Sequence, residues 1–459
     1  MLNWNQLLCE ERRRPRSGQA EGNGPYNTRN EFEIDYDRIV GSSSVRRLQD
    51  KAQVFPLQKN DFVRTRLTHS IEVSAIARSM AKTVGKLLER DKIFTREQTE
   101  KFIGMLQTAG LIHDLGNPPF GHYGEKIIQN WYREIILGEK KRKDKYYKET
   151  QEDMDFIHFD GNVQNLRIVT KLQTLNDQYG MNLTYGTLAT IIKYPFSSKN
   201  STHDKNKFGY FKSEEQIIQE IWKNTGLKEG VRHPATFLLE AADDIAYICD
   251  DIEDGVKKGY IPWNEEYKKL KDIFSEDDKY DEIFKKIDNI SLTQDMEKEK
   301  SIAHVRFFRN EVQGYLIKSA VKCFQDKYDQ IMEGKYGLND LLENDKKLVK
   351  ELKGITTKYC YACDEVLALE LVGDRVIKEL LNTFYTVIKN SNNNTLNDIS
   401  TYEGKIYHII SNNYKYIARF DYESNEYQKI HLITDFVSGM TDSYAVLLYK
   451  KLLGISLPE

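Results

Sequence analysis

Four residues from three distant stretches have the types and settings that metal-ion chemistry requires. His69 opens a helical segment (RTRLTHSIEV), the doublet His113-Asp114 ends another (GLIHDLGNPPFGHYGE), and Asp243 lies in LLEAADDIAYICDD. Apolar residues before the doublet indicate a buried helix end, where a carboxylate beside an imidazole is costly unless a cation compensates it. Mixed nitrogen and oxygen ligands suit Mn²⁺, Fe²⁺, Mg²⁺ or Zn²⁺. Four such ligands leave two positions of an octahedral ion for a water molecule and a substrate oxygen.

Each residue also has an ordinary explanation. A histidine near a helix start is often a surface or capping residue, and a His-Asp pair at a helix end often satisfies the terminus. The acidic run at 250–254 is typical of a solvated face. The CxxC pair Cys360 and Cys363 lacks the second pair that a structural zinc site needs, so we interpret it as two ordinary cysteines. The combination, rather than any single residue, favours a metal site.

Helices must position these residues. Apolar spacing of three and four predicts a helix after Thr68, a second that ends before the breaker cluster at 116–119, and a third over about 234–253. Further helices are expected at 300–330, 343–355, 364–390 and 444–453. Strand signals are few, and the segment 405–420 is the best candidate for a small β hairpin. The sequence therefore predicts an all-α fold.

Composition excludes several classes of protein. With 40% hydrophobic and 30% charged residues among 459, the chain can bury a sizeable core, and only 9 prolines favour helices. The net charge of −3 gives no bulk attraction for nucleic acid, although a local basic groove stays open. Five scattered cysteines indicate a reducing compartment. No apolar run approaches the roughly 18 residues of a membrane span, and the N-terminus lacks a signal-peptide core. We expect a cytoplasmic protein without a membrane partner.

Polar segments outline the expected organisation. Residues 1–30 are predicted to form a flexible N-terminal arm, with mobility near Gly18 to Gly24. Three further segments, at 139–148, 197–207 and 390–398, are expected to be solvated surface loops.

The sequence around the candidate ligands resembles the deoxyguanosine triphosphate triphosphohydrolase (dGTPase) family, and the ligands themselves resemble the H…HD…D signature of HD-domain metal phosphohydrolases. The matching segments follow the family order from about residue 29 to 450: RRLQDKAQVFPL (46–57), RTRLTHSIEV (64–73), HDLGNPPFGHYGE (113–125), NLTYGTLATIIKYP (182–195), EAADDIAY (240–247) and FVSGMTDSYAVLLY (436–449). The resemblance implies an HD-domain helical core over 31–262 with surface insertions. A C-terminal helical region over 263–459 would complete the nucleotide pocket and the oligomer contacts.

The resemblance also implies an activity. Enzymes of this family remove intact triphosphate from a dNTP by water attack at the α-phosphorus, here with dGTP as the favoured substrate. His69, His113, Asp114 and Asp243 would hold one Mn²⁺ or Mg²⁺ per subunit. Asp243 is preferred to Asp244 because the family's ligand lies four residues before a tyrosine, which is Tyr247 here.

The resemblance places His122 and Glu125 in the catalytic apparatus. They lie three residues apart on the helix after the PPFG turn. An imidazole suits proton transfer near neutral pH, and a carboxylate one turn away can orient it and raise its basicity. The role of His122 as acid, base or nucleophile stays open.

Eight further residues resemble the family's substrate contacts. The phosphate-facing set is Arg66, Asn162, Lys193, Tyr194 and Lys207, and the sugar-facing set is Gln53, Tyr247 and Asp251. The spacing i, i+4, i+8 puts Asp243, Tyr247 and Asp251 on one helix face, where the tyrosine ring would exclude a 2′-hydroxyl. Ser443 stands where some relatives carry a basic residue that helps to form a base pocket or nucleic-acid contact.

Partners and alternatives complete the prediction. The family implies a homo-oligomer, hexamer or tetramer, and single-stranded DNA as an effector. An HD nucleotidase or phosphodiesterase acting on mono- or cyclic nucleotides would use the same ligands but would not need a long cationic channel. A nucleotide-sensing or single-strand-binding regulator on a decayed HD scaffold ranks last, because all four ligands, His122 and Glu125 are intact.

Overall fold

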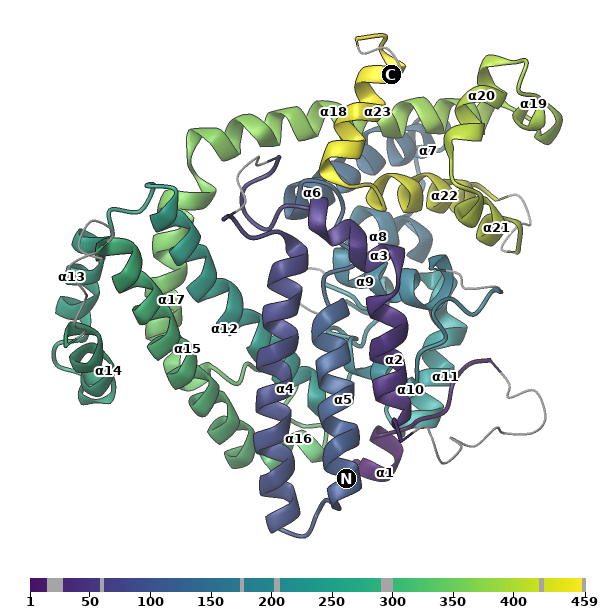
Figure 1. Cartoon of the computed structure of the whole chain (residues 1–459). Coiled ribbons are helices and arrows are strands. Elements are labelled where there is room, and N and C mark those ends of the chain that lie inside the picture. The colour runs from purple at the N-terminus through teal and green to yellow at the C-terminus, as the bar shows by residue number, and fades with distance from the viewer. Residues whose placement is uncertain are drawn as a thin grey trace.

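The computed structural model describes residues 1–14, 28–57, 62–173, 177–201, 207–289, 300–420 and 425–455. Within these ranges the chain is helical, and the only strand-like pairings are isolated bridges, for example between Ala52 and Thr65. The all-α prediction is confirmed (Figure 1). In the same described ranges no helix is both long enough and apolar enough to traverse a lipid bilayer.

The first half of the chain supplies the helices around the candidate site. Their bounds are α1 Trp4–Leu7, α2 Glu31–Val40, α3 Ser43–Arg47, α4 Arg66–Arg90, α5 Arg96–Ile112, α6 Gly121–Trp131, α7 Gly138–Lys143, α8 Gln151–Ile157, α9 Gly161–Arg167, α10 Tyr185–Thr190, α11 Glu215–Thr225 and α12 Pro234–Lys257. The three helices that were predicted to carry the metal ligands are α4, α5 and α12.

The second half is also helical. Its helices are α13 Trp263–Phe274, α14 Asp278–Asp288, α15 Lys300–Asp326, α16 Tyr328–Met332, α17 Lys346–Thr356, α18 Asp364–Asn390, α19 Asn393–Asn397, α20 Tyr402–Ile409, α21 Asn412–Phe420, α22 Glu426–Ser438 and α23 Asp442–Leu452. The predicted helices at 300–330, 343–355, 364–390 and 444–453 correspond to α15, α17, α18 and α23.

The expected β hairpin at 405–420 is wrong, because this segment forms α20 and α21. Its buried apolar residues recur at spacings of four and three, at Ile406, Ile410, Tyr414 and Ile417. The odd step would turn a strand to its other face, whereas both spacings stay on one face of a helix. The polar break after Ile410 ends one helix and starts the next instead of forming a hairpin turn.

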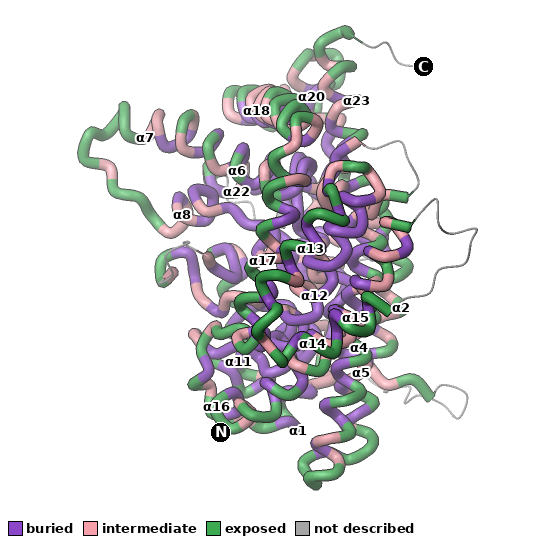
Figure 2. Tube along the Cα trace, turned by 90° about the vertical axis from the view of Figure 1, so that its left-hand side faces the viewer, coloured by how far each residue is buried: buried purple, intermediate pink, exposed green. Residues whose placement is uncertain are grey.

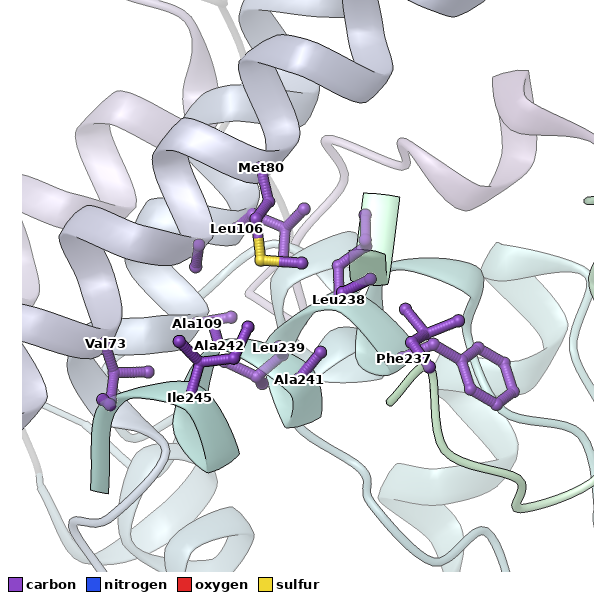
Figure 3. Packing of buried hydrophobic residues seen from close by; sticks show 14 of the residues in the cluster. Val73, Met80, Leu106, Ala109, Phe237, Leu238, Leu239, Ala241, Ala242 and Ile245 are labelled. Atoms are coloured by element: carbon purple, nitrogen blue, oxygen red, sulfur yellow. The ribbon is translucent and has the colours of Figure 1, made fainter. Parts of the chain in front are cut away.

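The larger core joins α4, α5 and α12. Capping boxes at Thr65 and Thr95 start α4 and α5, which lie side by side along most of their length (Figure 1). Figure 3 shows α12 packed against this pair through small and branched apolar side chains, among them Val73, Ala109 and Ile245. These contacts fix the three helices relative to one another, and each carries a candidate ligand.

A second core lies around α6, α18 and α22. Helix α18 joins the two cores, since Val366 near its start belongs to the larger core and Val376 and later residues belong to the second. In Figure 1 this helix runs across the top of the molecule, next to α23. The C-terminal helices therefore complete the packing around the site.

Several expected surface segments are different in the structure. Residues 1–14 are not a free arm, because Trp4 and Leu7 are buried and Arg12 forms an ion pair with buried Asp35. The predicted mobile stretch at 18–24 lies outside the described residues. Part of the 139–148 segment forms the partly exposed helix α7 (Figure 2), and part of the 390–398 segment forms α19. Most of the 197–207 segment, residues 202–206, is not described.

The acidic run at the end of α12 is buried rather than solvated. Asp250, Glu253 and Asp254 surround the guanidinium of Arg64, with Asp254 Oδ1 at 2.6 Å from Arg64 Nη1. Burial of these carboxylates is tolerated because they share Arg64 with one another, and Arg309 of α15 also pairs with Asp250 and Glu253. This ion-pair cluster ties the segment before α4 to the end of α12.

Candidate metal and nucleotide site

Helix ends and helix faces bring the four predicted ligands together. His69 lies in the first turn of α4, His113 is the C-cap of α5, and Asp243 faces them from the middle of α12. One donor atom from each of His69, His113 and Asp114 lies within 4.8 Å of the others. Asp243 Oδ1 is 3.0 Å from Nε2 of His69 and 3.4 Å from Nε2 of His113.

The donor set fits a divalent cation. The Nδ1–H of His113 donates to the backbone carbonyl of Gly110 at 2.8 Å, which leaves Nε2 as a lone-pair donor directed at the cluster. That Nε2 is buried and has no hydrogen-bond partner among the described residues. Burial alone would lower the pKa of His113, but Asp114 and Asp243 outweigh it and raise the pKa to about 9. The cluster therefore stabilises positive charge at its centre.

Two neighbours orient the Asp114 carboxylate. Asn117 Nδ2 donates to Oδ1 at 2.5 Å, and Arg66 Nη1 donates to Oδ2 at 2.5 Å. Burial would raise the pKa of Asp114, yet Arg66 and His113 hold it well below its usual range. Arg66, predicted to face phosphate, thus also fixes a candidate ligand in its ionised form.

The predicted catalytic pair is formed next to this cluster. His122 Nδ1 lies 3.1 Å from Glu125 Oε2, and the hydrogen bond and charge of Glu125 raise the pKa of His122. Glu125 is buried, and its other oxygen accepts the backbone N–H of Gly161 at 2.7 Å. His122 is 78% exposed, so its imidazole faces open space where a substrate could reach it.

One cavity of about 690 Å³ collects the remaining residues. This volume is within the roughly 300–1,000 Å³ typical of small-molecule sites. Its lining includes all but two of the predicted site residues: Gln53, Arg66, His113, Asp114, His122, Asn162, Lys193, Tyr194, Lys207, Asp243, Tyr247 and Asp251. The other two, His69 and Glu125, are buried and contact lining residues.

The predicted phosphate cations are paired with carboxylates. Lys193 forms an ion pair with Glu240, and Lys207 forms one with Asp160. Burial would lower the pKa of each ammonium, but the partner carboxylate raises it instead, so both amines are charged. The Asn162 side chain bonds to Asp160 at 2.8 Å and lies on the same wall.

The predicted sugar contacts lie along α12 and the loop after α3. The Tyr361 hydroxyl donates to Asp251, and both residues line the cavity with Tyr247. Burial raises the pKa of Asp251 to about 7, and the bond from Tyr361 opposes that rise. Oε1 of Gln53 is buried and accepts no hydrogen bond within the part of the chain that the structure describes, so a ligand hydroxyl could bind there.

Sequence reasoning missed one wall of this cavity. It is formed by side chains from α6, from the helical turn Thr357–Tyr361 after α17 and from the start of α18, namely Tyr123, Lys126, Tyr361, Val366 and Glu370. Tyr123 lies inside the quoted segment HDLGNPPFGHYGE but was not singled out there, and no quoted motif contains the other four. Ser443, by contrast, does not line the cavity; its hydroxyl bonds to Asp50 on the surface.

Comparison with known proteins agrees with this geometry. An HD-domain family model matches residues 66–161, which include His69, His113 and Asp114. A deoxyguanosinetriphosphate triphosphohydrolase-like protein of Listeria innocua is 40% identical over 99% of this chain and 100% of its own length. The chain belongs to the deoxyguanosinetriphosphate triphosphohydrolase family.

More distant members of the family match nearly as much of the chain. A triphosphohydrolase-like protein of Synechocystis is 34% identical over 99% of this chain and 100% of its length. A deoxyguanosinetriphosphate triphosphohydrolase of Enterobacter sp. is 30% identical over 92% of this chain and 94% of its length. Membership makes the chain an HD-domain phosphohydrolase, and HD domains depend on metal ions.

Proposed function

We propose that this chain is a metal-dependent dNTP triphosphohydrolase that converts dGTP to deoxyguanosine and inorganic triphosphate. The observation that carries the proposal is the meeting of three features in one cavity: the His/Asp cluster, the His122–Glu125 pair and the ammonium groups of Lys193 and Lys207. A site for mono- or cyclic nucleotides would not need the separate cations Lys193 and Lys207 beyond the cluster.

His69, His113, Asp114 and Asp243 would hold the ion, which we take to be Mn²⁺ or Mg²⁺. When bound there, a divalent ion supplies Lewis-acid chemistry that offsets charge at the reacting phosphoryl group and makes water a better nucleophile. Arg66, Lys193 and Lys207 would bind the triphosphate. His122, held by Glu125, would transfer a proton at the same phosphoryl centre.

The sugar would lie against α12. Tyr247 and Asp251 are one turn apart on the cavity side of the helix, so a ring and a carboxylate can contact one deoxyribose. The ring would fill the space of a 2′-hydroxyl, and Asp251 with Gln53 would bind the 3′-hydroxyl. This arrangement favours deoxyribonucleotides over ribonucleotides.

The wall from α6 and α18 supports guanine as the preferred base. Glu370 and Lys126 both line the cavity, and the charge of Lys126 opposes the rise in the pKa of Glu370 that burial causes. Guanine alone offers two adjacent N–H donors on its pairing edge, which a carboxylate can accept together, and its O6 can accept from lysine. Glu370→Gln should therefore reduce the preference for dGTP over dATP, by roughly tenfold if a bidentate contact is lost.

Product analysis with purified protein tests the reaction. With Mn²⁺ or Mg²⁺ in H₂¹⁸O, dGTP should yield deoxyguanosine and triphosphate, with the label in triphosphate because water attacks the α-phosphorus. Formation of dGMP and pyrophosphate would reject the proposal. The same assay over the four dNTPs, with mono- and cyclic nucleotides as alternative substrates, measures the substrate preference.

A matched pair of variants tests the ligand assignment. Asp243→Asn should abolish both tight Mn²⁺ binding and turnover, because Asp243 contacts both imidazoles. Asp244→Asn makes the same chemical change one residue along, where the carboxylate pairs with Lys353 at 3.3 Å, and should keep Mn²⁺ bound. The reverse result would move the ligand to Asp244.

A further inference from the structure

The turn between α22 and α23 contacts two loops that border the cavity. It spans Ser438 to Asp442, inside the segment FVSGMTDSYAVLLY that the proposed chemistry does not use. The first loop leads from Lys51 to Gln53, and the second runs from Asn117 to Phe120, just before α6. Neither loop is held by a regular helix or sheet, so their positions depend on contacts with other parts of the chain.

Asp442 joins both loops with one carboxylate. Its Oδ2 accepts the backbone N–H of Ala52 at 3.0 Å, and its Oδ1 accepts the backbone N–H of Phe120 at 3.0 Å. The side chain is only 1% exposed, so water does not replace these bonds. Two backbone donors need two acceptors, which a carboxylate supplies and a neutral amide of the same shape does not.

Lys51 adds a second bridge beside the first. Its Nζ donates to the backbone carbonyl of Asn117 at 2.5 Å and to that of Ser438 at 3.0 Å, and the side chain is 3% exposed. The loop with Asn117 is therefore fixed from both the N-terminal and the C-terminal side. Asn117 in turn bonds to Asp114, so this bridge reaches a candidate ligand.

The second loop needs such support because its backbone is strained. Phe120 has a φ of 61°, a left-handed conformation that is unfavourable for a residue with a side chain. Its ring packs over Gly373 of α18, where a Cβ would lie 2.8 Å from Phe120 Cγ. Two C-terminal residues, Asp442 and Gly373, thus hold the turn that leads directly into His122.

We propose that Asp442 is a positioning residue that sets the Gln53 loop and the His122 turn relative to each other across the cavity. It touches neither substrate nor ion and acts through the backbone of Ala52 and Phe120. The C-terminal segment would then control catalysis from 390 and 322 residues away along the chain. The activity readout below rests on the proposed function, whereas the exchange readout does not.

The test compares Asp442→Asn with Asp345→Asn in the full-length protein. Asp345 is also fully buried and accepts hydroxyl bonds from Tyr280 and Tyr315 at 3.0 Å each, but it does not line the cavity. In Asp442→Asn at least one of the Ala52 and Phe120 amides should exchange hydrogen at least tenfold faster. Asp345→Asn should leave both amides protected. Turnover of dGTP at saturation should fall at least tenfold further in Asp442→Asn than in Asp345→Asn, with a rise in KM because Gln53 lies on one loop.

Unchanged protection of both amides in Asp442→Asn, or a loss of turnover no larger than that of Asp345→Asn, overturns the proposal. If wild-type protein hydrolyses no dNTP, the proposed function fails while the exchange comparison still decides the positioning role. If Asp442→Asn does not fold, hydrogen exchange of the wild-type protein tests the positioning role instead. The Ala52 and Phe120 amides should then open with the same free energy as the amides of α23, and much faster exchange at both would refute the coupling.

Discussion

At the scale of single residues, Glu125 has two partners that impose one orientation on His122. One oxygen accepts the Gly161 N–H, and the other faces the imidazole. The charge of Glu125 raises the pKa of His122, so Glu125→Gln, which keeps the shape and one acceptor, should lower it. His122 would govern the acidic limb of the kcat/KM profile if it acts as a base and the basic limb if it acts as an acid. In either case a lower pKa should move that limb to lower pH.

Measurement of kcat/KM for dGTP across pH 5 to 9 checks this expectation. His122→Ala is the control: it should keep Mn²⁺ bound, since His122 is not among the clustered donors, and should lose turnover and the limb itself. A limb that stays in place in Glu125→Gln would mean that another group governs it.

Tyr247 is the residue at which sugar preference should change. Its ring lines the cavity one turn after Asp243, with the Lys353 ammonium 5.0 Å from the ring centroid. Tyr247→Ala should open space for a 2′-hydroxyl and reduce the ratio of dGTP to GTP turnover by about tenfold or more. Tyr247→Phe keeps the ring and should keep the ratio. An unchanged ratio in Tyr247→Ala, measured as kcat/KM for both nucleotides, would remove the steric argument.

The sequence allowed the motif-bearing residues to be predicted but not the whole cavity. His113 and Asp114 could be placed at a buried helix end from the apolar residues before them, whereas Asp243 was chosen over Asp244 from the resemblance to the family. Glu370 and Lys126 could not, because a charged residue on an amphipathic helix looks the same whether it faces solvent or a ligand cavity.

At the scale of elements, helix period predicted α4, α5 and α12, because their apolar residues recur at spacings of three and four over many turns. Residue propensity was misleading at 405–420, where β-branched and aromatic residues favoured a strand but two short helices formed. The burial of the N-terminal residues could not be predicted either, because Trp4 and Leu7 pack on helices far away in the chain.

The close approach of α4 and α5 gives an element-scale prediction. A Cβ on Gly110 would lie 2.8 Å from Ser74 Cα, so Gly110→Ala should push the two helices apart next to the His69–His113 pair. We expect Mn²⁺ affinity to fall about tenfold or more, with a stability loss of roughly 1–3 kcal/mol from overpacking. Titration of the apo protein with Mn²⁺ measures the affinity.

Gly104→Ala is the matched control on the same helix. Its Cβ would meet the Phe32 side chain on α2 at 3.3 Å, away from the ligands. This variant should keep its Mn²⁺ affinity, because the tight contact that it makes is with α2 and not with the helix that carries His69. Equal affinities in the two variants would show that helix spacing at Gly110 does not set the ligand geometry.

At the scale of the whole molecule, contacts between remote segments close the structure around the cavity. His233 makes one of these contacts, because it caps α12 and also bonds to the N-terminal segment. Its Nδ1 accepts the Ala235 N–H at 3.1 Å, and its Nε2–H donates to the Leu7 carbonyl at 3.1 Å. This requires a neutral ring, and burial lowers the pKa of His233 from 6.5 to about 4, against the opposing effect of the Leu7 bond.

The pH dependence of stability follows from this lowered pKa. Below about pH 6.5 the unfolded chain takes up a proton at His233 that the folded chain does not take up until about pH 4. Neutral His233 should therefore contribute fully to the free energy of unfolding above pH 6.5. This contribution should be lost as the pH drops to 4, by roughly 3 kcal/mol in total at 1.36 kcal/mol per pH unit.

His233→Asn keeps a capping oxygen but cannot titrate. Denaturant unfolding of both proteins at pH 7, 6 and 5 should show the wild-type advantage shrinking as the pH falls, because all other titrating groups are shared and cancel. Parallel pH curves would show that His233 does not stay neutral while it holds the N-terminal segment to α12.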